Sequence, residues 1–289
     1  MSAVEVVVES GNTLGEGVIW SERDRSLYWT DIEDQKLWSL DPGSGSTRTV
    51  DLPERLCSFA QRESGGFLFA FASGFVSYDP DADSYERICN VEEEKSTTRL
   101  NDGRCDRQGR FVVGGFDADA KGSSGAYRLD SDLSLHFLFG GLSSANSTCF
   151  SPDGKIMYHA DTPQGEIWVF DYDTDTGKPS NRRTFCRFDD QPGMPDGSIV
   201  DAEGCLWNAQ WNGGRVVRYR PDGTVDRIVE VPVMNPTCVA FGGSGLDTLF
   251  ITSAKFTMTE DQLKEYPLSG ALLAVRPGVT GIPDPLFKG

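Results

Sequence analysis

Polar side chains recur along this chain at a fixed distance before a turn, and their oxygen atoms are the groups best suited to chemistry. In five of six repeats a glycine follows the polar residue after eight positions, and in the first repeat that position is Asp24. The recurring residues are Glu16, Ser58, Asn101, Asn146, Asp196 and Asn235. Hard divalent cations prefer carboxylate and amide oxygens as ligands, so several of these residues meeting in space would form a cation site.

The sequence between these positions indicates strands. Each repeat crosses a small-to-apolar strand, turns, and returns as a second strand with β-branched and aromatic residues. An internal period of roughly 40–50 residues with several strands per unit is typical of propeller blades. We therefore predict an all-β fold, a six-bladed β-propeller that forms a single domain over residues 1–289, in which equivalent positions face a central channel.

Two further segments complete this prediction. The first strand-like residues, near Val4 to Val8, are expected to complete the last blade, because a closed array of sheets leaves no exposed edge. The run Thr259-Glu260-Asp261-Gln262 fits a capping box, which predicts one short helix from Thr259 to Tyr266.

Composition limits the classes of partner. The net charge of −17 argues against nucleic acid, because phosphate binding needs clustered Lys and Arg. That charge is compatible with cation binding, although a solvated acidic surface is its more common explanation. The N-terminus lacks a basic region followed by an apolar one, and no apolar run approaches the roughly 20 residues of a membrane span. We expect no signal peptide and no membrane association.

The seven cysteines are scattered and contain no CxxC pair, so a zinc-thiolate site is not expected. Cys105, Cys149 and Cys238 lie beside apolar residues and are interpreted as small buried hydrophobes. A reducing cytoplasm is the simplest setting for such a chain. His159 is interpreted as a packed, hydrogen-bonded strand residue, and no G-x-S-x-G elbow of a serine hydrolase occurs.

Two acidic runs are similar to calcium loops only at first sight. Asp79–Asp83 lacks the glycine and glutamate of an EF-hand and is interpreted as an outer turn. In Asp171–Gly177 the glycine comes one place late, and Arg182 falls where the bidentate glutamate should be. A hairpin loop is the better interpretation of this second run.

The third repeat holds a further group of polar residues. Asn101 and Asp102 are adjacent, so on a strand one can face the channel while the other hydrogen-bonds neighbouring backbone. Arg99 lies on the same side as Asn101, where its guanidinium fork would bind substrate oxygens, unless it is a surface arginine. Asp119 follows in a loop and either reaches over the channel mouth or is solvated.

Four motifs in order carry a resemblance to a known family. They are L-G-E-G-V-I-W at 14–20, R-L-N-D-G-R-C-D at 99–106, N-S-T-C-F-S-P-D-G at 146–154 and P-D-G-S-I-V-D at 195–201. Together they resemble the SMP-30/gluconolactonase family, also called regucalcin-like sugar lactonases, over nearly the full length. The tail I-T-S-A-K, followed by Y-P-L-S-G-A-L-L-A-V, is similar to bacterial members.

The resemblance implies a six-bladed β-propeller with one catalytic divalent metal ion in a central metal-binding channel. Its metal ligands fall on Glu16, Asn146 and Asp196. Its water- or substrate-contacting amide falls on Asn101, and its substrate-binding arginine falls on Arg99. A loop acid falls on Asp119, where relatives often have glutamate, and Asn146-Ser147 stands where many relatives have Asn-Gly.

Two carboxylates and one amide would form an oxygen-only site, which suits hard divalent cations. Ca²⁺ is the first expectation, followed by Mg²⁺ and Mn²⁺, and Zn²⁺ and Fe²⁺ are alternatives. Such a metal polarises an ester carbonyl and lowers the pKa of bound water from ~15.7 towards ~7. The predicted reaction is hydrolysis of an aldonolactone. Asp196 would be the general base, while Arg99 and Asn101 would bind ring hydroxyls.

Three alternatives stay open at this point. They are a non-enzymatic calcium- or metal-binding propeller, a related esterase or phosphotriesterase on a similar propeller, and a protein-interaction propeller. An apolar pocket would favour the second, whereas Arg99, Asn101 and Asp119 favour a polyol. The expected partner is a small-molecule sugar lactone, bound by a monomer or weak homo-oligomer.

Overall fold

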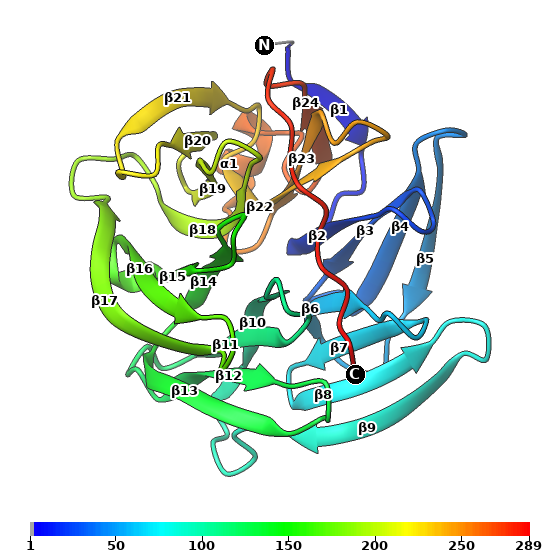
Figure 1. The fold of residues 1–289 in the computed structure, drawn as a ribbon. Helices are drawn as coiled ribbons and strands as arrows, with labels where there is room; N and C mark the ends of the chain where they lie inside the picture. Colours follow the sequence, from blue (N-terminus) through cyan, green and yellow to red (C-terminus); the bar gives the residue numbers. More distant parts are fainter. Residues whose placement is uncertain (1–2) are drawn as a thin grey trace. The chain divides into compact units, whose positions relative to one another are not determined.

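Six four-stranded antiparallel sheets make up most of the regular structure in a computed structural model that describes residues 3–289 (Figure 1). In five of the sheets the strands follow one another in chain order, and the sixth also contains the N-terminal strand β1. Met1 and Ser2, part of the N-terminal stretch in which no signal peptide is expected, lie outside the described residues.

The chain divides into two compact units of three sheets each, and it passes between them after Arg55, Arg187 and Pro283. The first unit holds the sheets β2–β5, β18–β21 and β22–β24 with β1. The second unit holds the sheets β6–β9, β10–β13 and β14–β17, together with the C-terminal residues Asp284–Gly289. A single domain over residues 1–289 stays a prediction.

The strands of the first unit are short and begin or end at turns. They are β1 (Glu5–Val8), β2 (Gly15–Ser21), β3 (Ser26–Asp31), β4 (Lys36–Asp41), β5 (Ser46–Asp51), β18 (Met194–Val200), β19 (Leu206–Trp211), β20 (Arg215–Tyr219), β21 (Val225–Glu230), β22 (Asn235–Gly242), β23 (Thr248–Ala254) and β24 (Leu272–Val275).

The strands of the second unit have the same arrangement, with one 3₁₀ turn, η1 (Thr162–Gln164), after β15. They are β6 (Leu56–Gln61), β7 (Phe67–Phe71), β8 (Gly74–Asp79), β9 (Ser84–Asn90), β10 (Thr98–Cys105), β11 (Phe111–Asp117), β12 (Ser124–Leu129), β13 (Leu135–Leu142), β14 (Ala145–Phe150), β15 (Ile156–Asp161), β16 (Glu166–Asp173) and β17 (Lys178–Arg187).

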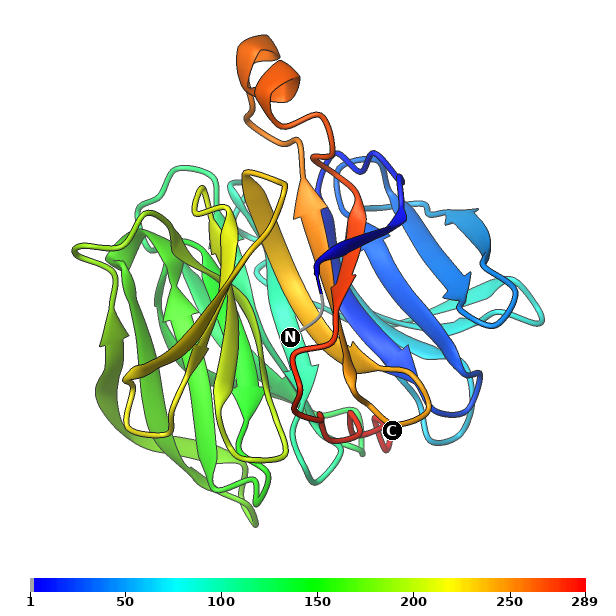
Figure 2. The same ribbon diagram turned by 90° about the horizontal axis from the view of Figure 1, so that it is seen from above.

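The predictions for the N-terminal strand and for the short helix after Thr259 are both confirmed. β1 pairs antiparallel with β24, with Glu5 opposite Ala274, and so supplies the fourth strand of the last sheet. Thr259 caps the N-terminus of the helix α1 (Glu260–Glu265): its hydroxyl accepts from Gln262 N, while the Gln262 side chain accepts from Thr259 N. Figure 2 shows α1 projecting beyond the ends of β23 and β24.

Burial falls from the first strand of a sheet to the last. Every residue of β6 is buried, whereas β9 in the same sheet is mostly exposed. Large apolar side chains fill the space between sheets within each unit, with Trp29 and Trp207 fully buried in the first. Burial of this apolar area is the main stabilising term of such a fold, at roughly 25 cal/mol per Å². It also holds the first strands, which carry the candidate residues, in fixed positions.

The pairing between the first and second strands shifts register in all six sheets, at or next to the recurring polar residue. Such β-bulges bend a strand and redirect its side chains. The five repeat glycines at the eight-residue offset all have positive φ, from 67° to 84°, which accounts for glycine there. In the first sheet the left-handed turn residue is Arg25 (φ 51°) rather than Asp24.

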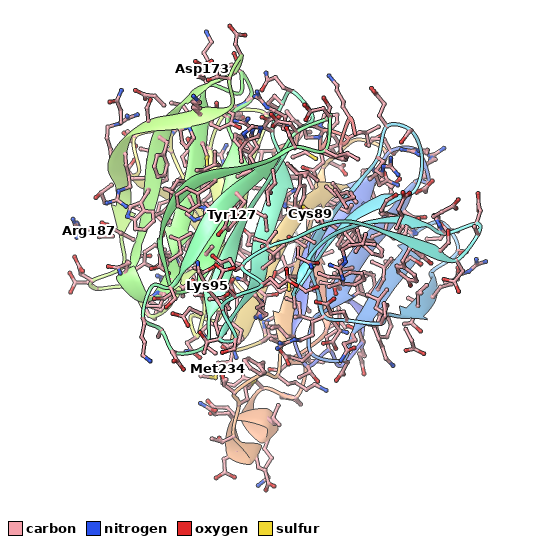
Figure 3. The ribbon with its side chains drawn as sticks, turned by 90° about the horizontal axis from the view of Figure 1, so that it is seen from below. Cys89, Lys95, Tyr127, Asp173, Arg187 and Met234 are labelled. Carbon is pink, nitrogen blue, oxygen red and sulfur yellow. The ribbon has the colours of Figure 1, made fainter. Side chains whose placement is uncertain are left out.

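Asp79–Asp83 leads from β8 into a turn and Asp171–Gly177 forms the end of the β16–β17 hairpin, as predicted, although Asp171 and Asp173 still belong to β16. Asp79 accepts hydrogen bonds from the backbone N–H groups of Asp81 and Ala82. Asp173, labelled in Figure 3, lies at the tip of the β16–β17 hairpin and accepts from the N–H groups of Asp175 and Thr176. Within residues 3–289, no helix combines the length and the apolar character needed to cross a bilayer.

Candidate metal and substrate site

Arg99 and Asn101 form a hydrogen-bonded pair on β10 in the second unit. Arg99 Nη1 donates to Asn101 Oδ1 at 2.6 Å and to the carbonyl of Leu100 at 2.9 Å. The guanidinium lies 4.5 Å from the centroid of the Phe116 ring, a favourable cation–π distance. Arg99 is 9% exposed and pairs with no carboxylate among residues 3–289. Its Nε and Nη2 donors therefore stay available for ligand oxygens.

Asn101 and its neighbour Asp102 both hold the adjacent strand β14. Asn101 Nδ2 donates to the carbonyl of Ala145 at 2.8 Å, and Asp102 Oδ2 accepts from Thr148 N at 2.7 Å. The two residues share the bulge between Leu100 and Gly103, so both reach β14. The prediction that one of them hydrogen-bonds neighbouring backbone is confirmed for Asp102, and burial raises the pKa of its carboxyl.

Asn146 lies between the two points at which β10 holds β14. Its side chain is buried, and its Nδ2 donates to Thr162 Oγ1 at 2.7 Å. Among residues 3–289 its Oδ1 atom accepts no hydrogen bond. The next residue, Ser147, has φ of 58°, the left-handed region that favours glycine. This conformation explains why many relatives, by the resemblance, have glycine at this position. In this chain a buried serine adopts the same conformation.

Glu16 occupies the corresponding register position of β2 in the first unit. Glu16 is opposite Thr30 as Asn146 is opposite Ala160, and in both strands the register then shifts. Gly17 follows with φ of 59°, close to the value for Ser147. Glu16 Oε2 accepts from the N–H of Gly17 at 3.0 Å. The glycine after Glu16 thus supplies the left-handed residue of the bulge.

Asp196 lies in the bulge of β18, also in the first unit, and is 5% exposed. Its backbone carbonyl accepts from Asn208 Nδ2 at 2.9 Å. A Cβ atom on the following Gly197 would lie 2.8 Å from the carbonyl oxygen of Thr237 on β22. Thr237 Oγ1 in turn donates to the carbonyl of Gly15, next to Glu16. The strands β18, β22 and β2 therefore pack in that order within this unit.

The predicted residues are thus grouped within each unit. The second unit brings together Arg99, Asn101 and Asn146, and the first unit holds Glu16 and Asp196 on strands that flank β22. No group of three or more His, Cys, Asp or Glu side chains with metal-binding geometry occurs in the described residues. The predicted ligand set has only two carboxylates and one amide, and its role stays a prediction.

Asp119 does not join the Arg99–Asn101 pair. Its carboxylate is 46% exposed and lies 2.8 Å from Lys121 Nζ. The loop folds instead around Asp117, which accepts from the N–H groups of Asp119, Lys121 and Ser123. These bonds, the one from Ser123 above all, hold the pKa of Asp117 well below its usual range. A substrate contact by Asp119 stays a prediction.

His159 is packed and hydrogen-bonded, as predicted. It is fully buried on β15, and its Nδ1 lies 3.2 Å from Thr148 Oγ1. Burial lowers the pKa of the imidazole to about 3, so the ring is neutral near pH 7. No disulfide joins any of the seven cysteines in residues 3–289, and Cys105, Cys149 and Cys238 are buried, as predicted.

Sequence analysis missed three residues that surround the candidates: Cys57 beside Arg99, Phe116 under its guanidinium, and Thr162 beside Asn146. Phe116 lies within β11 and Thr162 follows β15, and neither position has a local sequence signature of a site. Only the repeat could have pointed to Thr162. Thr162 directly follows Asp161, and Asp161 corresponds to Asp31 in the first repeat.

The SMP-30/gluconolactonase/LRE-like region family matches residues 14–255 of this chain. The chain belongs to this family. The match extends over all four motifs that suggested it and confirms the resemblance.

Two similar members of the family are bacterial proteins named as sugar lactonases. The 6-deoxy-6-sulfogluconolactonase of Pseudomonas putida is 39% identical over 99% of each chain. The L-arabinolactonase of Azospirillum brasilense is 41% identical over 98% of this chain and 95% of its own. Both alignments therefore leave almost no part of either protein unmatched.

A solved structure of regucalcin from Agrobacterium tumefaciens, described as a calcium-binding protein, has a TM-score of 0.94 with this chain. It is 30% identical and the match covers 99% of this chain and 97% of that chain. With the six four-stranded sheets, this similarity confirms the predicted fold class, an all-β six-bladed β-propeller.

Proposed function

We propose that this protein hydrolyses a sugar (aldono) lactone to the aldonic acid with the help of one divalent metal ion. The chain is an enzyme of the lactonase class, because relatives 39% and 41% identical over nearly their whole length carry that name. This near-complete match to two sugar lactonases is the observation that carries the proposal. The polar Arg99–Asn101 pair supports a polyol ligand rather than an apolar ester.

Glu16, Asn146 and Asp196 would hold the metal ion. The residues fit such a group: Asn146 Oδ1 is an acceptor that takes up no hydrogen bond within residues 3–289, and Asp196 is a nearly buried carboxylate. An oxygen-only set suits a hard cation, and the similarity to a calcium-binding regucalcin supports Ca²⁺ first. Mg²⁺, Mn²⁺, Zn²⁺ and Fe²⁺ are the alternatives to test.

The bound metal would act as a Lewis acid that polarises the lactone carbonyl. Asp196 serves as the general base and accepts a proton from the water whose oxygen attacks the carbonyl carbon. The ring C–O bond then breaks, the ring oxygen takes up a proton, and the product is the hydroxy acid. The addition of one water to the lactone balances the reaction.

Arg99 and Asn101 bind and orient the sugar. Nη1 of Arg99 is committed to Asn101 and Leu100, which leaves the Nε and Nη2 donors for ring hydroxyls or lactone oxygens. Stacking on Phe116 holds the fork in place. Binding energy used for such orientation raises the rate because it keeps the carbonyl near the attacking water.

Replacing Arg99 with Lys is expected to lower kcat/KM by about 10- to 100-fold, through weaker binding and poorer orientation of the sugar. Lys keeps the charge but loses the planar fork, and a hydrogen bond to a charged group contributes about 1.5–3 kcal/mol. Steady-state kinetics on the best lactone measures the change. Arg182→Lys is the matched control, because Arg182 also stacks on an aromatic ring, Trp168, but lies on an exposed strand. Equal kinetics for R99K and wild type would remove Arg99 from the substrate site.

A pH-indicator assay on a panel of aldono-1,4- and 1,5-lactones tests the function. The panel should include glucono-, galactono-, xylono- and arabinono-lactones and a 6-sulfonated gluconolactone. Chelator-stripped protein is assayed alone and with each divalent metal, and spontaneous hydrolysis is subtracted. Metal-dependent acid release is the expected result. No rate above background from folded, metal-loaded protein would instead favour a non-enzymatic metal-binding propeller.

A further inference from the structure

The outer strand β13 is unlike the outer strands of the other five sheets in its charge. Within residues 3–289 it pairs with β12 alone and forms the free edge of its sheet (Figure 1). It contains no Lys, Arg, Asp or Glu, whereas the outer strands β1, β5, β9, β17 and β21 each contain at least one. An edge strand is a template for pairing with another chain, and charged side chains are a common protection against it. We propose that two copies of this chain form a weak homodimer by pairing through β13.

Phe137 makes this edge apolar as well as uncharged. Its side chain is 63% exposed, the largest value among the exposed large hydrophobic residues in the described part of the chain. A bulge explains this exposure, because Phe137 is opposite Tyr127 while Phe139 is opposite Ala126, with one extra residue between the two phenylalanines. They therefore point to opposite faces of the sheet. Phe139 stacks on Phe170 at 5.2 Å, whereas Phe137 has only an edge contact with Tyr127 at 5.6 Å.

The backbone of β13 is accessible along the same edge. Gly140 and Gly141 are exposed, and Leu135 and Leu138 are half-buried, so no long side chain covers the N–H and C=O groups. Another strand satisfies a row of such groups most fully, because its own N–H and C=O groups have the matching spacing. The occupant that this edge fits is therefore an extended, uncharged strand with an apolar face, and β13 itself has these properties.

Charge favours a second copy at this edge over other parts of the surface. The chain has a net charge of −17, so two copies repel each other wherever carboxylates meet. Around a two-fold axis at Phe137 the two strands would run antiparallel, with both Phe137 side chains on one face. The acidic turn Asp130–Asp132 of one copy would then lie near Gly140–Leu142 of the other, and not near the same turn. Such an isologous contact closes at two chains.

The bulges limit the strength of this pairing. Only Leu135–Phe137 pairs with β12 in an uninterrupted register, and the register then shifts twice before Leu142. A short regular stretch offers few hydrogen bonds between chains, and bulges twist an edge away from a partner. We therefore expect an equilibrium between monomer and dimer that depends on protein concentration.

Analytical ultracentrifugation of the full-length protein tests the proposal over about 1–300 µM protein and about 50–500 mM salt. The expected result is a monomer–dimer equilibrium that shifts towards the dimer as salt is added. Salt screens the repulsion between two acidic chains but leaves an uncharged contact intact. A monomer under all conditions, or a dimer that dissociates as salt is added, would overturn the proposal.

Phe137→Lys should raise the dimer Kd by about 10- to 100-fold, because it removes the central apolar side chain and places two positive charges side by side. Val225→Lys is the matched control. Val225 is 46% exposed at the start of the outer strand β21, which already contains charged residues, so this substitution makes the same change of charge elsewhere. V225K should dimerise as the wild type does. Equal Kd values for F137K and wild type, or an equal loss in V225K, would contradict a contact at β13.

Hydrogen exchange distinguishes strand pairing from other contacts. The amides of Leu135–Leu138 should exchange more slowly as the wild-type concentration rises, and F137K at the same concentrations should lack this protection. Concentration-dependent protection confined to other strands would overturn the proposal. None of these measurements involves a metal ion or a lactone, so their outcome is independent of the proposed enzymatic function.

Discussion

Asp196→Asn is expected to lower kcat on the best lactone by about 10²- to 10⁴-fold, even with saturating metal. The substitution keeps the shape of the side chain but removes the basic oxygen, and general-base catalysis contributes about that factor. The side chain is 5% exposed and lies on a bulge fixed by Gly197, so little rearrangement is available to replace it. Stopped-flow or steady-state kinetics over a range of metal concentrations distinguishes the loss of the general base from weaker metal binding.

Asp189→Asn is the matched control for this experiment. Asp189 is exposed in the same unit and loses the same charge, so its kinetics should match those of the wild type. Near-normal kcat in D196N with saturating metal would exclude Asp196 as the base. The base would then have to come from another group, and the assignment of Asp196 as a ligand would be tested separately by metal titration.

Phe287→Ala is expected to lower the free energy of unfolding by about 3–5 kcal/mol, the usual loss for a buried phenylalanine. Phe287 is fully buried in the second unit, beside the β6–β9 sheet where the chain ends (Figure 1). Its N–H donates to the Gln61 carbonyl and its carbonyl accepts from Glu63 N, both at 2.8 Å. Urea denaturation measures the loss.

The rest of the tail supports the same expectation. Arg104 Nη1 contacts both oxygens of Asp284, at 2.7 and 2.8 Å, and Arg62 Nε donates to the carbonyl of Gly289 at 2.8 Å. Lys288→Ala removes an exposed side chain and should stay within about 0.5 kcal/mol of wild type. A loss below about 1 kcal/mol in F287A would mean that the tail contributes little to the unit.

Several parts of this protein followed from local sequence. The strands, the closing of the last sheet by β1 and the helix after Thr259 all depend on contacts or preferences within a few residues, or on a pattern repeated along the chain. The repeat glycines were predictable because a positive φ selects glycine wherever the turn recurs. The family resemblance rested on the same repeated turns and strands, and the comparisons confirm it.

Other parts needed the tertiary structure. Strand alternation would place Asn101 and Asp102 on opposite sides, but the bulge directs both towards β14, where Asn101 contacts Ala145, 44 positions away. For the loop acid Asp119 the sequence left two positions open, over the channel mouth or in solvent. In the structure its loop folds around Asp117 and its carboxylate lies beside Lys121.

The sequence by itself therefore determined the kind of fold, the family and the residue types available for chemistry. Only the tertiary structure decided how those residues are held: Arg99 by Asn101, Asn146 by Thr162, and the C-terminal residues by the sheet that contains Gln61. The physical reason is the distance along the chain between the residues that interact. Secondary-structure preferences act between neighbours in the chain, whereas the orientation of a buried polar side chain depends on partners that only packing brings within about 3 Å.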